Sequence, residues 1–555
     1  MKRNNFFSPS TLARRVSVAA FSIFALALAA CGSDPTGGGS GSGGSGSGNG
    51  SGSDTESTEK VDKIVEWMDD RLQKEYYWME EYNQKRSTFD MTVAWDKYLG
   101  ISLAKMTTNS DDGSGSGSNR HLYTFIQRKK VGSAAATLTR ALYPMESGFG
   151  IDLSYYIVNM AGVDKYVQGN YGFPINHVYP GSTAEALGIK RGDVILEVNS
   201  QPIDNINYSN LWSSVSTGAQ NMDVTIYGYN EETEEYELVD YSLTVGNYEA
   251  NPVAYGDLLT IDKDVFDVGD KKIGYLCYLA FEADFDQRMV DAVSNLIEKG
   301  ATDVILDLRS NGGGHVSSSI LLSSMLLDES YVAPNKIYAR LRHNPNNNVY
   351  SDEEYPLVKT YVPNGTSTST DLPNLGLNKV WIICSEDSAS ASEMVIVGLR
   401  GLDVEVELVG NITEGKNCGM EVTYKTYSGY EYTFAPITFM NENGKGFSNY
   451  GDGIIPEHYL YEKASDTSLS EYLRGMCDYY PIPLTTWGDF ENDIALRETV
   501  MQICGRSLFE KTTNVVPVAK STRSSSVPMP KRTGLKMEKQ DLNSQGMFIL
   551  QQDVE

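Results

Sequence analysis

The stretch KVWIICSEDSASASEMVIVGLRG, residues 379–401, runs from a block of apolar residues through a serine-rich turn into a second apolar pattern. The first six residues are almost all apolar and include β-branched and aromatic side chains, which is typical of a buried strand. Apolar residues recur at helical spacing from residue 394 onward, which predicts a helix. A buried strand that turns directly into a helix is the repeating half-unit of an α/β protein.

Similar units flank this stretch. Three further runs are predicted to be strands: KIGYLCYLAF at 272–281, DVILDL at 303–308 and VEVELVG at 404–410. An amphipathic helix pattern follows the first of them and ends at Gly300, and a second helix is predicted through SSILLSSMLL. The alternation predicts an α/β core over residues 255–465 with much parallel pairing, interrupted by a polar insertion near 329–378.

Ser388, Ser390 and Ser392 lie in the turn of the opening stretch, and two interpretations are open for them. Serine is a preferred cap of a helix N-terminus, and from this stretch alone capping is the favoured interpretation. A serine at this position could instead be a nucleophile, because the unpaired N–H groups and the dipole of a helix N-terminus stabilise a developing oxyanion.

Two neighbouring segments favour chemistry over capping. Lys416 follows VEVELVG in a glycine turn, where burial would lower its pKa from about 10.4 and leave an amine able to accept a proton from serine. The triplet Gly312–Gly314 follows the strand at 303–308, where glycine lets a backbone N–H and a substrate chain come close.

Four short motifs follow one another along this core. They are Asp307-Leu308-Arg309-Ser310-Asn311-Gly312-Gly313-Gly314, Ser388-Ala389-Ser390-Ala391-Ser392-Glu393, Thr413-Glu414-Gly415-Lys416 and Gly451-Asp452-Gly453-Ile454-Ile455-Pro456-Glu457. In this order they resemble the motifs of the C-terminal processing, or tail-specific, serine peptidases. The resemblance spans residues 60–465 and implies a crotonase- or ClpP-like α/β peptidase core, with a PDZ domain inserted in it or preceding it and a helical segment at the N-terminus.

The resemblance also implies roles for individual residues. Ser390 would be the nucleophile and Lys416 the general base, with the oxyanion held by the backbone N–H groups of Gly314 and Ala391. Ser388 and Ser392 would then be loop and cap residues.

The chain departs from the family pattern near Lys416. Met420 stands where family members often carry a glutamine that orients the lysine. Other candidates for that role are Thr413, Asn417 and Glu421. Gly401 occupies the position of an acidic residue found in other members, with Asp403 two positions further on. The third catalytic group therefore stays open.

Residues 140–247 are predicted to form short strands and turns. YPGSTAEALGIKRGDVILEVNSQPI, at 179–203, combines a loop, a short helix, a glycine stop and a strand. Upstream lies the apolar–Gly–apolar sequence Phe149-Gly150-Ile151. This order resembles a PDZ domain, in which the backbone N–H groups of such a loop bind the terminal carboxylate of a polypeptide. The alternative is a generic small β domain.

The N-terminus is typical of an exported lipoprotein. Four basic residues precede the apolar run VSVAAFSIFALALAA, which is too short to span a bilayer comfortably. Leu28-Ala29-Ala30-Cys31 looks like a bacterial lipobox, in which cleavage leaves a lipidated Cys31; the alternative is an ordinary signal peptide with an incidental cysteine. The expected location is the bacterial cell envelope, periplasmic or surface-exposed, with lipid chains binding the membrane.

Composition indicates whether nucleic acid, anionic lipid or a metal is an expected partner. The net charge of −27 argues against nucleic acid and against charge-driven binding to anionic lipid. The five cysteines other than Cys31 and the five histidines show no metal-ligand spacing, so neither a metal nor another cofactor is expected. Cys418, two residues after Lys416, is interpreted as a small buried hydrophobic residue. The sequence carries no signal for oligomeric state.

The predicted organisation has seven segments. They are a lipoprotein signal peptide (1–30), a lipidated cysteine with a Gly/Ser linker (31–57), an N-terminal helical segment (58–135), a PDZ-like domain (140–247), the peptidase core (255–465), C-terminal helices (466–512) and a low-complexity tail (513–555). In the tail, the closing GMFIL is a candidate edge strand.

These patterns together predict a lipid-anchored serine endopeptidase with a Ser390–Lys416 dyad, which recognises polypeptide C-termini through its PDZ domain. One rival is a binding protein on the same scaffold with a misaligned dyad, supported by Met420 in place of the glutamine. A second rival is a crotonase-like acyl hydrolase, which the PDZ-like segment and the lack of a CoA-binding signal disfavour.

Overall fold

The computed structural model of the 555-residue chain describes most of the predicted core, the PDZ-like region and the flanking helices. The described residues are 61–107, 112–113, 122–131, 143–154, 156–163, 165–230, 232–233, 235–480 and 484–509, together with the backbone of two short strands at 538–539 and 547–550. The predicted signal peptide, Cys31 and the Gly/Ser linker lie outside these residues.

A six-stranded sheet, which we call the core sheet, organises the peptidase-like region. Its order is β11 (Val253–Leu258), β12 (Ile273–Tyr278), β13 (Asp303–Asp307), β18 (Lys379–Cys384), β19 (Glu405–Gly410) and β23 (His458–Tyr459). All neighbours are parallel except the antiparallel pair β11–β12. All six residues of β12 are buried, as expected for a parallel strand that helices cover on both faces.

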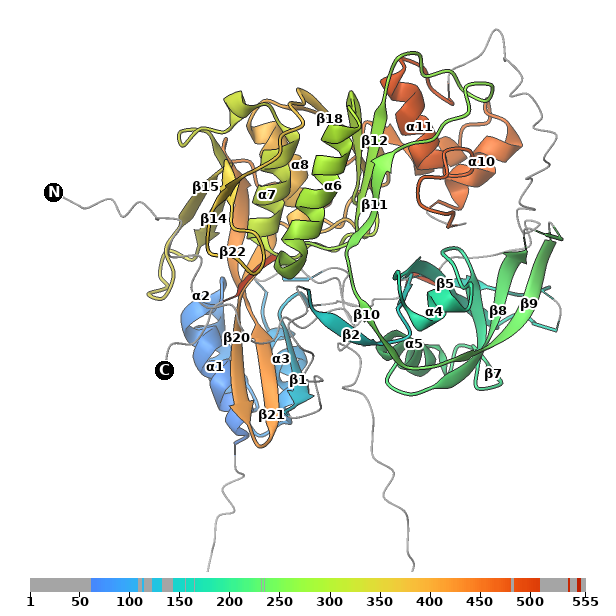
Figure 1. Cartoon of the computed structure of the whole chain (residues 1–555). Coiled ribbons are helices and arrows are strands. Elements are labelled where there is room, and N and C mark those ends of the chain that lie inside the picture. The colour runs from blue at the N-terminus through green and yellow to red at the C-terminus, as the bar shows by residue number, and fades with distance from the viewer. Residues whose placement is uncertain are drawn as a thin grey trace, which may run out of the picture.

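Helices cover the two faces of the core sheet (Figure 1). On one face lie α6 (Asp286–Glu298), α7 (Val316–Leu326) and α8 (Ala391–Gly401). On the other lie α9 (Leu460–Ala464), α10 (Glu471–Asp478) and α11 (Ile494–Ile503). Successive strand residues alternate between these two cores, so that Leu276 and Leu306 join the first while Tyr275 and Ile305 join the second. This alternation explains why the strands are apolar throughout.

A second sheet packs beside the core sheet and was not predicted. Its order is β1 (Phe125–Lys130), β21 (Tyr430–Ala435), β20 (Cys418–Tyr427), β22 (Ile437–Asn443), β14 (Ile337–His343) and β15 (Glu353–Pro356). The polar insertion therefore contributes β14 and β15, and it also forms the short pair β16 (Thr360–Tyr361) and β17 (Thr370–Asp371).

The N-terminal helices cover one end of this second sheet. They are α1 (Lys63–Glu75), α2 (Met79–Lys85) and α3 (Trp95–Leu103), with a 3₁₀ turn at Arg86–Thr88. The apolar face of α1 is buried against β20 and β21, with Ile64, Val65, Met68 and Leu72 fully enclosed. The segment 58–135 is not wholly helical, however, because β1 pairs with β21.

The PDZ-like region is inserted between β1 and β11. Its entrance strand β2 (Met145–Gly148) and exit strand β10 (Gly246–Glu249) pair antiparallel. The strands between them are β3 (Ile151–Leu153), β4 (Tyr156–Asn159), β5 (Tyr171–Val178), β6 (Val194–Val198), β7 (Gln201–Pro202), β8 (Met222–Asn230) and β9 (Glu235–Leu243), with helices α4 (Thr183–Ala186) and α5 (Tyr208–Thr217). They enclose a hydrophobic core of their own, separate from that of the core sheet.

Two strands of the tail pair with distant parts of the chain. β24 (Glu538–Lys539) lies antiparallel to β4 of the PDZ-like region. β25 (Met547–Leu550) lies parallel to β20, with Met547 opposite Gly419 and Leu550 opposite Val422. The prediction that the GMFIL segment forms an edge strand is thereby confirmed.

The predicted fold class, an α/β core with a smaller inserted β domain and N-terminal helices, is confirmed. In the part of the chain that the structure describes, no helix is long and apolar enough to cross a bilayer.

Close packing between α8 and β14 gives a stability prediction. A Cβ added at Gly398 would lie 2.3 Å from the ring of Tyr338, so we expect Gly398→Ala to lower the free energy of unfolding by about 1–3 kcal/mol through overpacking. Urea unfolding followed by circular dichroism measures this. Gly100, in α3, is a matched control because a Cβ there meets no atom within 4 Å. Gly100→Ala should be neutral or stabilising by up to about 1 kcal/mol, and equal effects of the two changes would contradict the packing account.

Candidate active site

Ser390 is the N-cap residue of α8, at the end of the turn that leaves β18. Its φ of +59° lies in the left-handed region, which serine adopts rarely. Its N–H donates to Oε2 of Glu393 (2.8 Å) and its carbonyl accepts from Met394 N–H (2.8 Å). The first turn of the helix therefore holds Ser390 in a strained conformation, and strain of this kind gathers at functional sites.

The other serines of the turn bind the loop that follows β13. Three hydroxyls donate to backbone carbonyls of that loop: Ser385 to Arg309, Ser388 to Leu308 (2.8 Å) and Ser392 to Asn311 (2.8 Å). The expectation that Ser392 is a cap is wrong, because Ser390 caps α8 and the Ser392 hydroxyl is used across the two loops. Ser388 is a loop residue, as expected.

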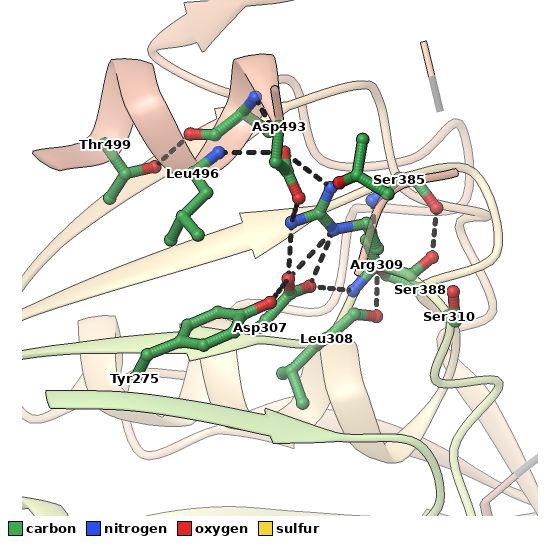
Figure 2. A network of polar contacts seen from close by, with 12 residues as sticks. Tyr275, Asp307, Leu308, Arg309, Ser310, Ser385, Ser388, Asp493, Leu496 and Thr499 are labelled. Carbon is green, nitrogen blue, oxygen red and sulfur yellow. Dashed lines mark hydrogen bonds and ion pairs between the residues drawn. The ribbon is translucent and has the colours of Figure 1, made fainter. Parts of the chain in front are cut away.

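Arg309 fixes the loop after β13 from the opposite side (Figure 2). Its buried guanidinium lies 2.6 Å from Asp307 Oδ2 and 2.7 Å from Asp493 Oδ2, at the N-terminus of α11. Tyr275 donates a further hydrogen bond to Asp307 (2.6 Å). With two carboxylates on one guanidinium, the buried charges are compensated, and the loop is joined to both β12 and α11.

The glycine loop comes directly against Ser390. A Cβ built on Gly313 would lie 2.9 Å from Cβ of Ser390 and 3.1 Å from the backbone N of Ala391. A Cβ on Gly314 would lie 2.3 Å from the carbonyl oxygen of Phe281, and both glycines have positive φ. Among the hydrogen bonds of the described residues, the N–H groups of Gly314 and Ala391 have no acceptor. Two backbone donors are therefore available where the glycine loop meets the start of α8.

Lys416 is fully buried, in the turn between β19 and β20. Its Nζ has no hydrogen-bond partner within the part of the chain described, and it lies 4.3 Å from the centroid of the Tyr123 ring. Burial lowers the pKa of Lys416 to about 8, because the charged form loses hydration that nothing fully replaces. Tyr123, whose hydroxyl donates to Glu414 (3.0 Å), was missed at the level of sequence because it is 293 positions away from Lys416.

Glu393 joins the serine turn to the lysine turn. Its buried carboxylate accepts hydrogen bonds from four groups: the backbone N–H of Ser390, Gly415 and Lys416 (each 2.8 Å) and the hydroxyl of Thr413 (2.6 Å). Burial raises the pKa of Glu393 to about 7, and these hydrogen bonds oppose that shift. Backbone N–H groups can only donate, so the arrangement needs the ionised carboxylate.

The residues predicted as candidates for orienting the amine of Lys416 contact other groups in the structure. Thr413 acts on Glu393 rather than on the amine. Asn417 donates to the carbonyl of Ser448 (2.9 Å), and Glu421 faces His343, with 3.9 Å between Oε1 and Nε2. Asp403 is exposed and pairs with a surface lysine. In the described structure, none of these side chains binds the amine, whereas the Tyr123 ring lies over it.

The predicted carboxylate loop of the PDZ-like region is well anchored. Phe149 and Ile151 are buried, and Gly150 has a φ of +74°. The carbonyl of Phe149 accepts from Ala184 N–H (3.1 Å) and that of Gly150 from Tyr179 N–H (2.9 Å). Two carbonyls of the loop are therefore bound within the domain, and the loop leads into β3 and then β4. In the predicted mode, a peptide adds to this strand edge with its terminal carboxylate at the loop.

The PDZ-like region touches both loops of the site. Asn176, at the end of β5, accepts from Ser310 (3.2 Å), and the Tyr156 hydroxyl donates to Glu386, four residues before Ser390. Arg191 donates to the carbonyl of Thr485 in the segment between α10 and α11 (2.7 Å). The predicted peptide-binding region therefore lies against the candidate catalytic loops.

The arrangement as a whole suits acyl transfer. It combines a strained serine at a helix N-terminus, a buried amine of lowered pKa and two backbone N–H donors, which are the parts of a Ser–Lys nucleophile with an oxyanion site. Among the described residues, no cluster of histidine, cysteine or acidic side chains could hold a metal ion.

Comparison with known proteins gives matches in both regions. Residues 272–460 match the model of peptidase family S41, and residues 175–211 match that of the PDZ domain. The carboxy-terminal processing protease CtpA of Bacillus subtilis is 23% identical over 247 residues, 44% of each chain. The chloroplastic carboxyl-terminal-processing peptidase 1 of Arabidopsis thaliana is 25% identical over 289 residues, 52% of each chain. The matches thus span about half the length of these curated relatives.

A solved structure shares the fold. It is a Bacteroides fragilis protein assigned to the S41 proteases, with a TM-score of 0.54 and 20% identity, and the alignment covers 79% of this chain and 97% of that one. Residues 272–460 are therefore similar to peptidase family S41, and the region before them, similar at 175–211 to a PDZ domain, completes a fold shared with a solved structure.

Proposed function

We propose that this protein is a serine endopeptidase in which Ser390 and Lys416 form the catalytic dyad. The observation that carries the proposal is the junction at Glu393, whose carboxylate binds the backbone N–H of both dyad residues. A lysine that is buried, has a lowered pKa and lacks an anionic partner on Nζ among the described side chains is suited to be a general base.

The proposed reaction follows from these positions. The Ser390 hydroxyl attacks the carbonyl carbon of a peptide bond while its proton passes to the neutral amine of Lys416. The N–H groups of Gly314 and Ala391 bind the oxyanion of the tetrahedral intermediate. Lys416 then gives the proton to the leaving amine, and the acyl group remains on Ser390. A water molecule hydrolyses this acyl-enzyme with Lys416 again accepting the proton.

The PDZ domain is proposed to capture the polypeptide substrate. PDZ domains bind an extended chain end by adding it to a strand edge, with the terminal carboxylate on the apolar–Gly–apolar loop. Phe149, Gly150 and Ile151 would form that loop here. Its contacts with the candidate catalytic loops support delivery of the bound chain to Ser390.

Cys31 is proposed to carry lipid that binds the protein to a membrane of the bacterial cell envelope. The support is the lipobox-like end of the apolar run, and lipid would supply the membrane binding that a net charge of −27 does not. Nucleic acid is not a proposed partner, because the net charge is −27.

The alternative function is a peptide-binding protein with an inactive dyad. Met420, which replaces a glutamine of the family pattern, is the feature that favours it. The same position lies in β20 and is buried, so an apolar residue fits it without any loss of packing.

Removal of either dyad residue tests the proposed chemistry. Ser390→Ala and Lys416→Met should each lower kcat/KM on an unfolded, fluorescein-labelled casein at least about 1,000-fold, because the nucleophile or its base is lost. Lys445→Met, which removes an exposed lysine, is the matched control and should keep full activity. Circular dichroism and urea unfolding check that each variant is folded. Substantial cleavage by either dyad variant would contradict the assignment, and an inactive parent that still binds peptides would favour the alternative function.

The pH dependence of the reaction follows from the pKa of Lys416. Its amine must be neutral to accept a proton, and with a pKa of about 8 only about a tenth is neutral at pH 7. We therefore expect kcat/KM to rise with pH up to about 8 and then to level off. Protonation of Glu393, whose pKa is raised to about 7, would make kcat/KM fall more steeply as the pH decreases below 7. A flat profile between pH 6 and pH 9 would exclude Lys416 as the base.

Lipidation can be tested in a bacterial expression host. The parent protein should label with a radioactive fatty acid and sediment with membranes, whereas Cys31→Ser should lose both properties. Cys504→Ser is a control for the loss of a cysteine elsewhere. Label on Cys31→Ser would show that lipid is attached at another residue.

A further inference from the structure

The tail strand β25 fills a backbone edge that starts beside the candidate catalytic lysine. β20 begins at Cys418, two residues after Lys416, and β25 pairs with its residues Gly419–Val422. β21 and β22 pair with β20 through its other edge, so β25 occupies an edge that the rest of the sheet does not use.

The position of β25 also brings it to the element that carries the glycine loop. β25 contacts α7, which begins two residues after Gly314 (Figure 1, short red segment between α7 and β20). The backbone of Met547–Leu550 thus lies between the segment that follows Lys416 and the helix that follows Gly314. The edge of β20 is thus a place where an extended chain could add as a strand close to the candidate dyad, a mode by which proteins commonly bind peptides.

The second tail strand occupies the corresponding edge of the PDZ domain. β24 pairs antiparallel with β4, with Glu538 opposite Ile157 and Lys539 opposite Tyr156. β4 follows the loop Phe149–Ile151 and is bound through its other edge by β5. This is the edge to which a PDZ domain adds a peptide strand.

We propose that the two tail strands are an intramolecular competitor of polypeptide substrates, with β24 on the PDZ edge and β25 on the edge of β20. The proposal rests on the proposed peptidase function, and it assigns a regulatory role to the tail of the chain itself. Because the competitor belongs to the same chain, its effective concentration is of the order of mM, so a few backbone hydrogen bonds suffice to hold it. A substrate with longer strand pairing displaces it.

Amide hydrogen exchange tests whether β25 occupies the edge of β20, and it does not rely on catalysis. In the Ser390→Ala background, chains ending at residue 555, 550 and 546 are compared. Removal of 551–555 should leave exchange at Gly419–Val422 unchanged, whereas removal of β25 as well should speed it at least about tenfold, since paired amides exchange only on opening. Equal exchange in the chains ending at 550 and 546 would overturn the proposal.

A pair of proline variants provides the matched test of strand pairing. Phe548→Pro/Ile549→Pro removes two successive backbone N–H groups of β25, one of which faces β20 because successive residues point to opposite edges. Gln551→Pro/Gln552→Pro makes the same chemical change just beyond the strand. Only the first double variant should speed exchange at Gly419–Val422. Equal effects of the two would overturn the proposal.

Inhibition is measured with a synthetic peptide of residues 543–553, NSQGMFILQQD, labelled with a fluorophore. It should bind the Ser390→Ala chain ending at 537 about tenfold more tightly than the full-length Ser390→Ala chain, which corresponds to about nine-tenths occupancy by the tail. In the catalytically intact series, KM for labelled casein should fall by a similar factor on truncation while kcat stays constant. If none of the chain lengths cleaves casein, the proposed peptidase function is contradicted. The hydrogen-exchange and peptide-binding results then still decide whether the tail occupies the edge of β20. Equal peptide affinity in the two lengths would overturn the competitor role.

Discussion

The buried carboxylate of Glu393 is the interaction on which the candidate site depends. A carboxylate without hydrogen bonds would be costly in a dry interior, and four donors compensate it here. Three of these donors are backbone N–H groups from two separate turns, one after β18 and one after β19. The charge of a single side chain therefore joins the turn that carries Ser390 to the turn that carries Lys416.

Within the described residues, the amine of Lys416 has no ion-pair partner, although the carboxylate of Glu393 binds the backbone of the same residue. Glu393 contacts Lys416 through the backbone N–H, and its oxygens are used by other donors. A direct ion pair would raise the pKa of the amine and keep it charged. The ring of Tyr123 lies 4.3 Å from the buried amine, and burial lowers the pKa of Lys416 to about 8. The N-terminal segment, through Tyr123, thereby contributes to the chemistry of a site built mainly by the core sheet.

Sequence patterns predicted the core sheet well and the second sheet poorly, and the reasons are physical. Strands such as β12 and β18 are buried on both faces, so their continuous apolar runs stand out. β20 and β21 carry charged and polar residues because the end of the hairpin near the Ser–Gly turn is exposed, although the alternation in EVTYKTYSGYEYTF around that turn was a usable signal. The roles of Glu393 and Tyr123 depend on contacts between distant segments, which no local pattern encodes. Ser392 was misassigned because serine suits both a cap and a cross-loop hydrogen bond.

We propose that Glu393 aligns the Ser390 and Lys416 turns for acyl transfer. This proposal is tested most directly by the second-order rate at which a fluorophosphonate probe labels Ser390 at pH 8, in the parent and in Glu393→Gln. A glutamine amide presents N–H groups to the backbone donors and would separate the turns, so labelling should slow at least about 100-fold in a variant that remains folded, with no labelling of Ser390→Ala. Labelling of folded Glu393→Gln at the parental rate would contradict the account.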